Sequence, residues 1–240
     1  MSRKSVFKKS KSRFERDIST RAPRKTFLIV TEGQKTEPLY FESFGLSSVT
    51  IVGTGFNTTA LIEKALELKM QRPEIDEIWC VFDRDSFDQG SIKAAINKAD
   101  SEGIRIAYSN ECFELWYLLH FDYFDTEHTR DQYEIKLTDR LGIKYEKNKD
   151  ISDRLKPMLS GAILHAKKLL KNLGVSVSRA EIQFCKRYPG LDPIKTKPFT
   201  TVYELVEELL NERERIGLTP YITQAPAIPP HSNNPPQFSE

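Results

Sequence analysis

Three acidic residues of this sequence follow short apolar segments and could together bind a metal ion. Glu32 comes directly after the apolar segment 26–31 (TFLIVT). Asp83 and Asp85 come after a second such segment, 77–82 (EIWCVF). Carboxylate oxygens suit Mg²⁺, which usually binds one or two carboxylates and keeps several water molecules. A bound divalent ion polarises a phosphate group and lowers the pKa of a water ligand, so these residues predict a site that hydrolyses phosphodiester bonds.

The predicted roles of these acids differ. Alternate residues at a strand end can point the same way, so Asp83 and Asp85 could share one cation, with Asp88 adding a further oxygen. Glu32 could act as a general base or as a further ligand. The alternative is a structural role, because aspartate is common in turns and at helix caps.

The segments around the acids predict an α/β fold. Four strand candidates alternate with four helix candidates: strands 26–31, 49–52, 77–82 and 104–108, and helices 36–44, 58–70, 91–102 and 111–121. Apolar strands joined by helices predict a parallel, Rossmann-like sheet covered on both faces. Ligands bind such sheets at the carboxyl ends of the strands. Because the first and third strands are often neighbours, we expect Glu32 to lie near Asp83 and Asp85.

The composition divides the chain into four parts. Residues 1–25 form a predicted basic arm, 26–125 the α/β core, and 126–216 a mainly helical extension packed on that core. Six of the 24 residues in 217–240 are proline, which predicts an extended, proline-rich tail.

The charge is unevenly distributed. The net charge is +2, but residues 1–25 carry +8 and the remainder carries −6. A basic arm on a mildly acidic body is typical of a phosphate-binding tail, although a solvated arm without a partner has the same composition. If the arm binds nucleic acid, its predicted contacts are Lys8, Lys9, Lys11, Arg13, Arg24 and Lys25.

Several classes of protein are excluded. No apolar run approaches the roughly 20 residues that span a bilayer, and the charged N-terminal segment is not typical of a secretory signal. The three cysteines (Cys80, Cys112, Cys185) are widely spaced, which indicates neither a disulfide framework nor a zinc site. We therefore expect a cytoplasmic protein with no membrane partner, and leave a homo-oligomer open.

Longer motifs resemble those of the RloB-like family of Toprim-fold proteins. They cover about residues 24–212 and comprise V30-TEG-33 with T36-E37 and Y40-F41, F82-DRD-85 with D88, S109-NECFELW-116 with L119-HF-121, Y145-EK-147, and D192-P193 leading to T201-VYELV-206. The sequence departs from the family pattern at Glu111, where a proline is expected.

The resemblance implies a catalytic set of Glu32, Asp83, Asp85 and Lys147, with Mg²⁺ or Mn²⁺ as cofactor. It implies an endonuclease that cuts DNA or tRNA as the effector of a bacterial antiphage, abortive-infection system, together with an AAA/ABC-type ATPase encoded nearby. The alternative is a non-catalytic subunit of the same system that binds nucleic acid or a partner. A primase-like nucleotidyl transferase is a third interpretation.

Three further residues could support the site. Glu37 could reach the metal region, or merely place favourable negative charge near a helix N-terminus. Glu114 lies among apolar residues, so its carboxylate must be paired or functional if it is buried. Arg84 could contact substrate or balance local charge. Outside this set, His120 is expected to interact with the dipole at the C-terminal end of helix 111–121.

Overall fold

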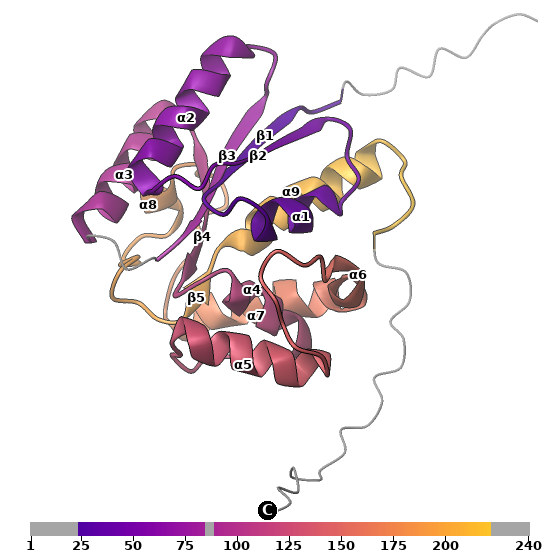
Figure 1. Ribbon diagram of the computed structural model, residues 1–240. Helices are drawn as coiled ribbons and strands as arrows, with labels where there is room; N and C mark the ends of the chain where they lie inside the picture. Colours follow the sequence, from indigo (N-terminus) through magenta and orange to yellow (C-terminus); the bar gives the residue numbers. More distant parts are fainter. Residues whose placement is uncertain (1–23, 85–88, 222–240) are drawn as a thin grey trace, which may run out of the picture.

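The computed structural model describes residues 24–84 and 89–221, and a five-stranded sheet forms its centre (Figure 1). The strand order is β2-β1-β3-β4-β5. The strands are β1 (Phe27–Thr31), β2 (Val49–Gly53), β3 (Glu77–Asp83), β4 (Arg105–Asn110) and β5 (Phe199–Thr200). The first four are parallel, which confirms the predicted α/β sheet, and β5 is added antiparallel to β4.

The strands are apolar on both faces because helices cover both faces of the sheet. Helices α2 (Thr58–Gln71) and α3 (Gln89–Glu102) pack on one face, and α1 (Thr36–Glu42) and α9 (Val202–Arg215) lie on the other (Figure 1). Every residue of β1 is consequently buried.

The register places the exits of β1 and β3 side by side. Thr31 pairs with Val81, and the Glu32 N–H continues the ladder by donating to the Val81 carbonyl at 2.9 Å. The expected pairing of the first and third strands is therefore present, and the residues that follow them share one edge of the sheet.

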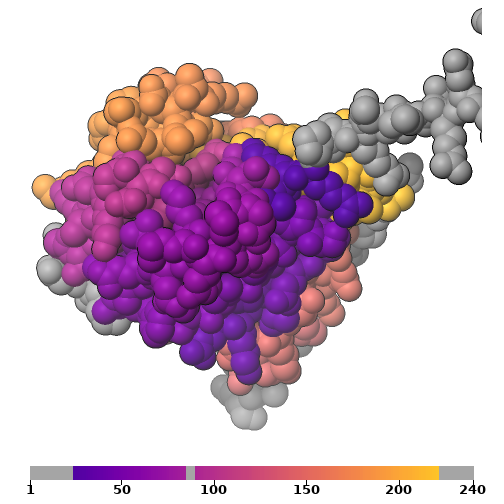
Figure 2. Space-filling view, turned by 90° about the horizontal axis from the view of Figure 1, so that it is seen from above, coloured from indigo at the N-terminus to yellow at the C-terminus, as the bar shows by residue number. Residues whose placement is uncertain are grey.

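A group of helices follows the first four strands. Helix α4 (Glu114–Phe121) contacts both α5 (Arg130–Leu141) and α7 (Leu159–Asn172). Before α7, the chain forms the short α6 (Ser152–Leu155) and a 3₁₀ helix (Lys156–Met158). The short α8 (Phe184–Arg187) lies against α3, where Asp100 accepts from the Phe184 N–H at 2.5 Å. In Figure 2 the orange surface lies directly against the magenta surface.

Several element ends differ from the prediction by one or two residues, and three larger differences stand out. The helix expected to begin at Glu111 begins at Glu114, after a cis peptide bond between Asn110 and Glu111. The α/β core does not end at residue 125, because β5 pairs with Ser109 and Asn110. Helix α5 was not predicted, although Thr129 and Gln132 form a capping box at its start.

Candidate active site

Glu32 and Asp83 line a single pocket of about 310 Å³ at the carboxyl ends of β1 and β3. Glu32 is the residue after β1, and Asp83 is the last residue of β3. Glu37 of α1 and Arg130 of α5 line the same pocket. The structure thus brings together acids that lie about 50 residues apart in sequence, at the edge where open α/β sheets bind ligands.

Asp83 is held by contacts on both carboxylate oxygens. Arg130 Nη2 lies 3.2 Å from Oδ1, and the Phe113 N–H donates to Oδ2 at 3.3 Å. Burial raises the pKa of Asp83 well above its usual value, and the Arg130 guanidinium opposes this rise. The pKa is raised further by the surrounding carboxylates (Glu32, Glu37, Glu114). The site therefore concentrates negative charge around Asp83.

Glu37 points into the same region from the first turn of α1. Glu37 is only 8% exposed. Burial raises its pKa to about 6, its own backbone N–H lowers it, and Glu114 raises it again. A Cβ added at Gly33 would overlap the Glu37 carboxylate, so the absence of a side chain at Gly33 makes room for this acid.

A second pocket of about 170 Å³ adjoins the first and contains Lys147. Lys147 Nζ lies 3.0 Å from Glu134 and 3.9 Å from Glu114, whose Oε1 also accepts from the Tyr145 hydroxyl at 3.1 Å. Burial acts to lower the pKa of Lys147, but the two glutamates raise it overall. The buried Glu114 is thus paired, as the sequence required, and Lys147 lies beside the carboxylates rather than in an isolated loop.

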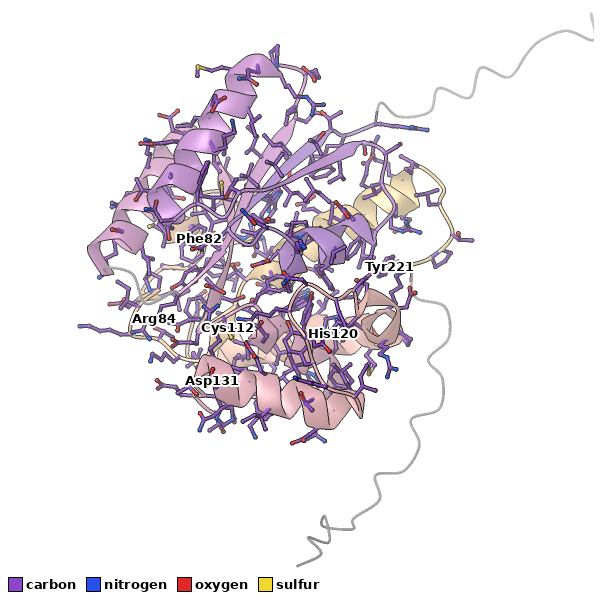
Figure 3. The ribbon with its side chains drawn as sticks, viewed as in Figure 1. Phe82, Arg84, Cys112, His120, Asp131 and Tyr221 are labelled. Carbon is purple, nitrogen blue, oxygen red and sulfur yellow. The ribbon has the colours of Figure 1, made fainter. Side chains whose placement is uncertain are left out.

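Arg84 contacts an acid that is not one of the predicted metal ligands. Its Nη1 lies 3.4 Å from Glu111 Oε2, and its N–H donates to the Ser109 carbonyl at 3.0 Å. It lies just past the end of β3 (Figure 3). Its role in the described contacts is to balance the charge of Glu111.

The described part of the chain contains only some of the predicted metal ligands. Asp85 and Asp88 lie outside the described residues. Among residues 24–84 and 89–221, no group of three or more His, Cys, Asp or Glu side chains is arranged to hold a metal ion. Glu32 and Asp83 are the predicted ligands that the structure places together.

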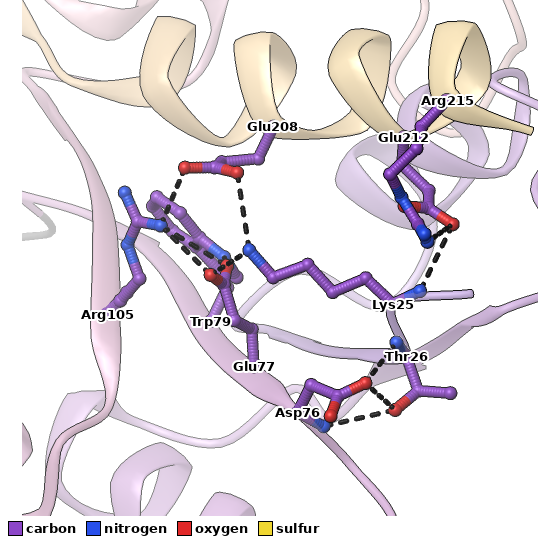
Figure 4. A network of polar contacts seen from close by, with 9 residues as sticks. All are labelled: Lys25, Thr26, Asp76, Glu77, Trp79, Arg105, Glu208, Glu212 and Arg215. Atoms are coloured by element: carbon purple, nitrogen blue, oxygen red, sulfur yellow. Dashed lines mark hydrogen bonds and ion pairs between the residues drawn. The ribbon is translucent and has the colours of Figure 1, made fainter. Parts of the chain in front are cut away.

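Lys25 lies just before the amino end of β1 and takes part in the polar network of Figure 4. Its ammonium pairs with Glu77 and lies 3.5 Å from Glu208, and its backbone N–H donates to Glu212 at 3.2 Å. Arg105 joins this network 2.9 Å from Glu208. The network ties the start of β1 to α9, so the ion pairs that Lys25 makes in the structure are with carboxylates of its own chain.

The other predicted contacts of the basic arm remain predictions. Arg24 Nη1 lies 3.4 Å from Ser47 Oγ, and Arg24 is exposed. The remaining arm residues lie outside the described part of the chain: Lys8, Lys9, Lys11 and Arg13.

Arg130 was not singled out from the sequence. It is the first residue of α5 and pairs with Asp83 across 47 positions of the chain. The capping box at Thr129 could have indicated that a helix starts there. No local signal indicates that this helix start lies beside β3.

The predicted dipole interaction of His120 is wrong. His120 is buried inside the molecule, with Nδ1 2.9 Å from the Trp116 carbonyl oxygen (Figure 3). Burial lowers its pKa to about 4, so the ring is neutral at pH 7 and carries no charge for the dipole to stabilise.

The fold and the site together define a class of protein: an α/β protein of the Rossmann-like, Toprim type, with carboxylates at the ends of two neighbouring parallel strands. The chain belongs to the RloB-like protein family, whose model matches residues 27–209. A search of the curated proteins and a search of the solved structures found no match. No helix in the described part of the chain has the length and apolar character needed to cross a membrane.

Proposed function

We propose that this protein is a metal-dependent endonuclease that hydrolyses phosphodiester bonds in DNA or tRNA at the pocket at the carboxyl ends of β1 and β3. The observation that carries the proposal is the shared pocket of Glu32, Glu37, Asp83 and Arg130 at the carboxyl edge of the sheet. Membership of the RloB-like family supports it.

The donor set of the pocket fits Mg²⁺ or Mn²⁺. Both prefer hard oxygen ligands, and Mg²⁺ is usually held by one or two carboxylates, water and substrate phosphate. Glu32 and Asp83 supply two carboxylates in one pocket. Burial, and after it the nearby carboxylates, raise the pKa of Asp83, and a bound divalent cation would offset the charge of these carboxylates. Asp85 and Asp88 remain proposed ligands. The bound ion would supply a polarised phosphate and a water of lowered pKa.

The protein side chains have distinct proposed roles. Glu32 accepts a proton from the attacking water, whose oxygen forms the new bond to phosphorus as the bond to the leaving oxygen breaks. Arg130 and Lys147 neutralise charge that develops on the phosphate oxygens. Both cations already lie beside carboxylates of the site, Arg130 3.2 Å from Asp83 and Lys147 3.9 Å from Glu114.

The proposal is tested by incubating the purified protein, alone and together with the proposed ATPase partner, with single-stranded DNA, duplex DNA and tRNA in Mg²⁺, Mn²⁺ or EDTA. We expect metal-dependent cleavage that is lost in Asp83→Asn and in Glu32→Gln. Asp153→Asn is the matched control, because the Asp153 side chain is 93% exposed. Cleavage that survives in EDTA or in Asp83→Asn would overturn the proposal.

We also propose that the protein is the effector of an antiphage system and acts with an AAA/ABC-type ATPase. The family membership supports this context. The test is to sequence the nucleic-acid ends formed in cells that express the chain with and without the neighbouring ATPase, using wild type and Asp83→Asn. New ends that require both the ATPase and Asp83 are the expected result.

A non-catalytic, nucleic-acid-binding or regulatory subunit is the second candidate function, favoured by the +8 charge of residues 1–25. The structure sharpens its test. Because Lys25 takes part in the network at the amino edge of the sheet, the deletion should remove residues 1–23 only. Protection of cells that is lost in this deletion but kept in Asp83→Asn would favour the regulatory role over the nuclease.

A further inference from the structure

Phe56 is an aromatic residue at the rim of the carboxylate pocket that the hydrolytic roles leave unused. It lies in the loop between β2 and α2 and lines the pocket together with Glu32 and Asp83. It is 46% exposed. Among the residues that the structure describes, it is the only exposed Phe, Tyr or Trp. Burial therefore explains why the other described positions carry an aromatic residue, but it does not explain Phe56.

The loop that carries Phe56 is fixed against the exit of β1. The Thr54 N–H donates to the Thr31 carbonyl at 3.0 Å, and the Gly55 N–H donates to the Glu32 carbonyl at 2.8 Å. The Phe56 N–H donates to Thr54 Oγ1 at 3.1 Å. A ring on a loop held in this way loses little conformational freedom when a ligand packs on it.

Two neighbours hold the loop on its other sides. Gly55 has φ +68°, and a Cβ added there would lie 2.6 Å from Gln34 Nε2, so the loop and the turn after β1 are in close contact. Asn57, directly after Phe56, caps α2 by accepting from the Ala60 N–H at 3.1 Å. The position of Phe56 is thus set by both the turn after β1 and the first turn of α2.

The surroundings of Phe56 favour a nucleobase over a protein partner. Its neighbours in the pocket are mostly charged or polar, including Glu32, Glu37, Asp83 and Arg130. The buried core of a protein interface is depleted in charged residues. A single ring beside groups that act on a phosphate instead fits a base-stacking position, because every nucleobase presents a flat π-face.

We propose that Phe56 stacks on an unpaired nucleobase of the nucleotide next to the scissile phosphate, so that the protein acts on single-stranded or looped nucleic acid. A base inside a duplex already has neighbours on both faces, and only an unpaired or extruded base presents a free face. This inference rests on the proposed function for its substrate class, but it is tested by binding and does not require cleavage.

The test measures binding of fluorescent oligonucleotides by the full-length protein in Ca²⁺. The probes are a single strand of about ten nucleotides, the same strand with abasic positions, and a duplex of the same sequence. Base–aromatic stacking contributes about 1–3 kcal/mol, so Phe56→Ala should bind the single strand roughly 5- to 150-fold more weakly. Phe56→Tyr should retain binding. Leu164→Ala, at a residue of α7 that is 66% exposed, should bind like wild type.

A spectroscopic variant makes the stacking itself visible. Trp79 and Trp116 are both 0% exposed, so Phe56→Trp adds an exposed indole to a background of buried ones. Single-stranded probe should quench its emission, and abasic probe should not.

The outcomes separate the two proposals. Unchanged binding by Phe56→Ala, or equal binding of the abasic strand, would overturn the inference. If Phe56→Ala binds the oligonucleotides like wild type but no longer binds the ATPase, Phe56 is a protein contact. This result would also overturn the inference. Phe56-dependent binding without any cleavage in Mg²⁺ or Mn²⁺, by the protein alone or together with the ATPase, would overturn the nuclease proposal and leave the stacking position intact.

Discussion

Replacing Glu37 by glutamine is expected to stabilise the folded protein at neutral pH. Burial, opposed by its own backbone N–H and reinforced by Glu114, raises the pKa of Glu37 from 4.5 to about 6. The ionised carboxylate is therefore less favourable in the folded chain than in the unfolded chain. Glutamine has nearly the same shape but cannot ionise, so the variant removes this penalty and keeps most of the packing.

The magnitude follows from linkage. One pKa unit corresponds to about 1.4 kcal/mol, so a rise from 4.5 to about 6 costs the folded state about 2 kcal/mol once the group is ionised. Because the folded pKa is the higher one, the wild type pays no penalty below pH 4.5, loses stability as the pH rises from 4.5 through 6, and reaches the full loss above 6. We expect Glu37→Gln to match wild type near pH 4 and to exceed it by about 2 kcal/mol at pH 8. The melting temperature should rise by roughly 4–8 °C at pH 8.

The assay is urea denaturation of both proteins between pH 4 and 8, with EDTA present so that no divalent cation binds the carboxylates. Glu63→Gln is the matched control, because the Glu63 side chain is 61% exposed and should show little change. A Glu37→Gln variant that is no more stable than wild type at pH 8 would refute the reasoning. A stability gain of equal size at pH 4 and pH 8 would refute it as well, because ionisation could not then be its cause.

Three other predictions concern different parts of the structure. Gly33→Ala should lower the midpoint of thermal denaturation, because the new methyl group overlaps the Glu37 carboxylate. For the same reason it should weaken Mn²⁺ binding, measured by calorimetry. Adding Glu37→Ala to this variant should restore the thermal midpoint. Because burial lowers the pKa of His120 from 6.5 to about 4, the wild type should lose about 3 kcal/mol of stability as the pH falls from 6.5 to 4. In denaturant titrations over this pH range, His120→Gln should not show this loss of stability. Lys25→Met should lower the free energy of unfolding, measured by urea denaturation, by about 1 kcal/mol because two carboxylates lose a partly buried partner.

The strands and the acids that follow them could be predicted because their signals are local. The run of apolar residues in β1 is explained by burial on both faces, and an acid directly after such a run marks the exit of the strand. The same holds for β3 and Asp83. Since the first and third strands of such sheets are often neighbours, their approach could be expected from the element order, and the register of Thr31 with Val81 agrees with it.

Elements whose stability depends on distant partners could not be predicted in the same way. Strand β5 has only two residues and gains its hydrogen bonds by pairing with Ser109 and Asn110, about 90 positions earlier. Helix α5 is mostly polar and buries only Tyr133, Leu137 and Leu141, so its apolar stripe is narrow. Both elements are stabilised by contacts that no short window of sequence contains.

The sequence by itself determined which residue types stand at the ends of the strands, because strand formation and burial depend on runs of neighbouring residues. Only the tertiary structure decided which side chains meet there. Arg130 reaches Asp83 because α5 packs on α4, and Phe56 stands at the rim because its loop bonds to the exit of β1. The physical reason is that these contacts depend on how whole helices and strands pack against one another. Such packing brings together residues that are far apart in the sequence, and the residues around each of them do not indicate the contact.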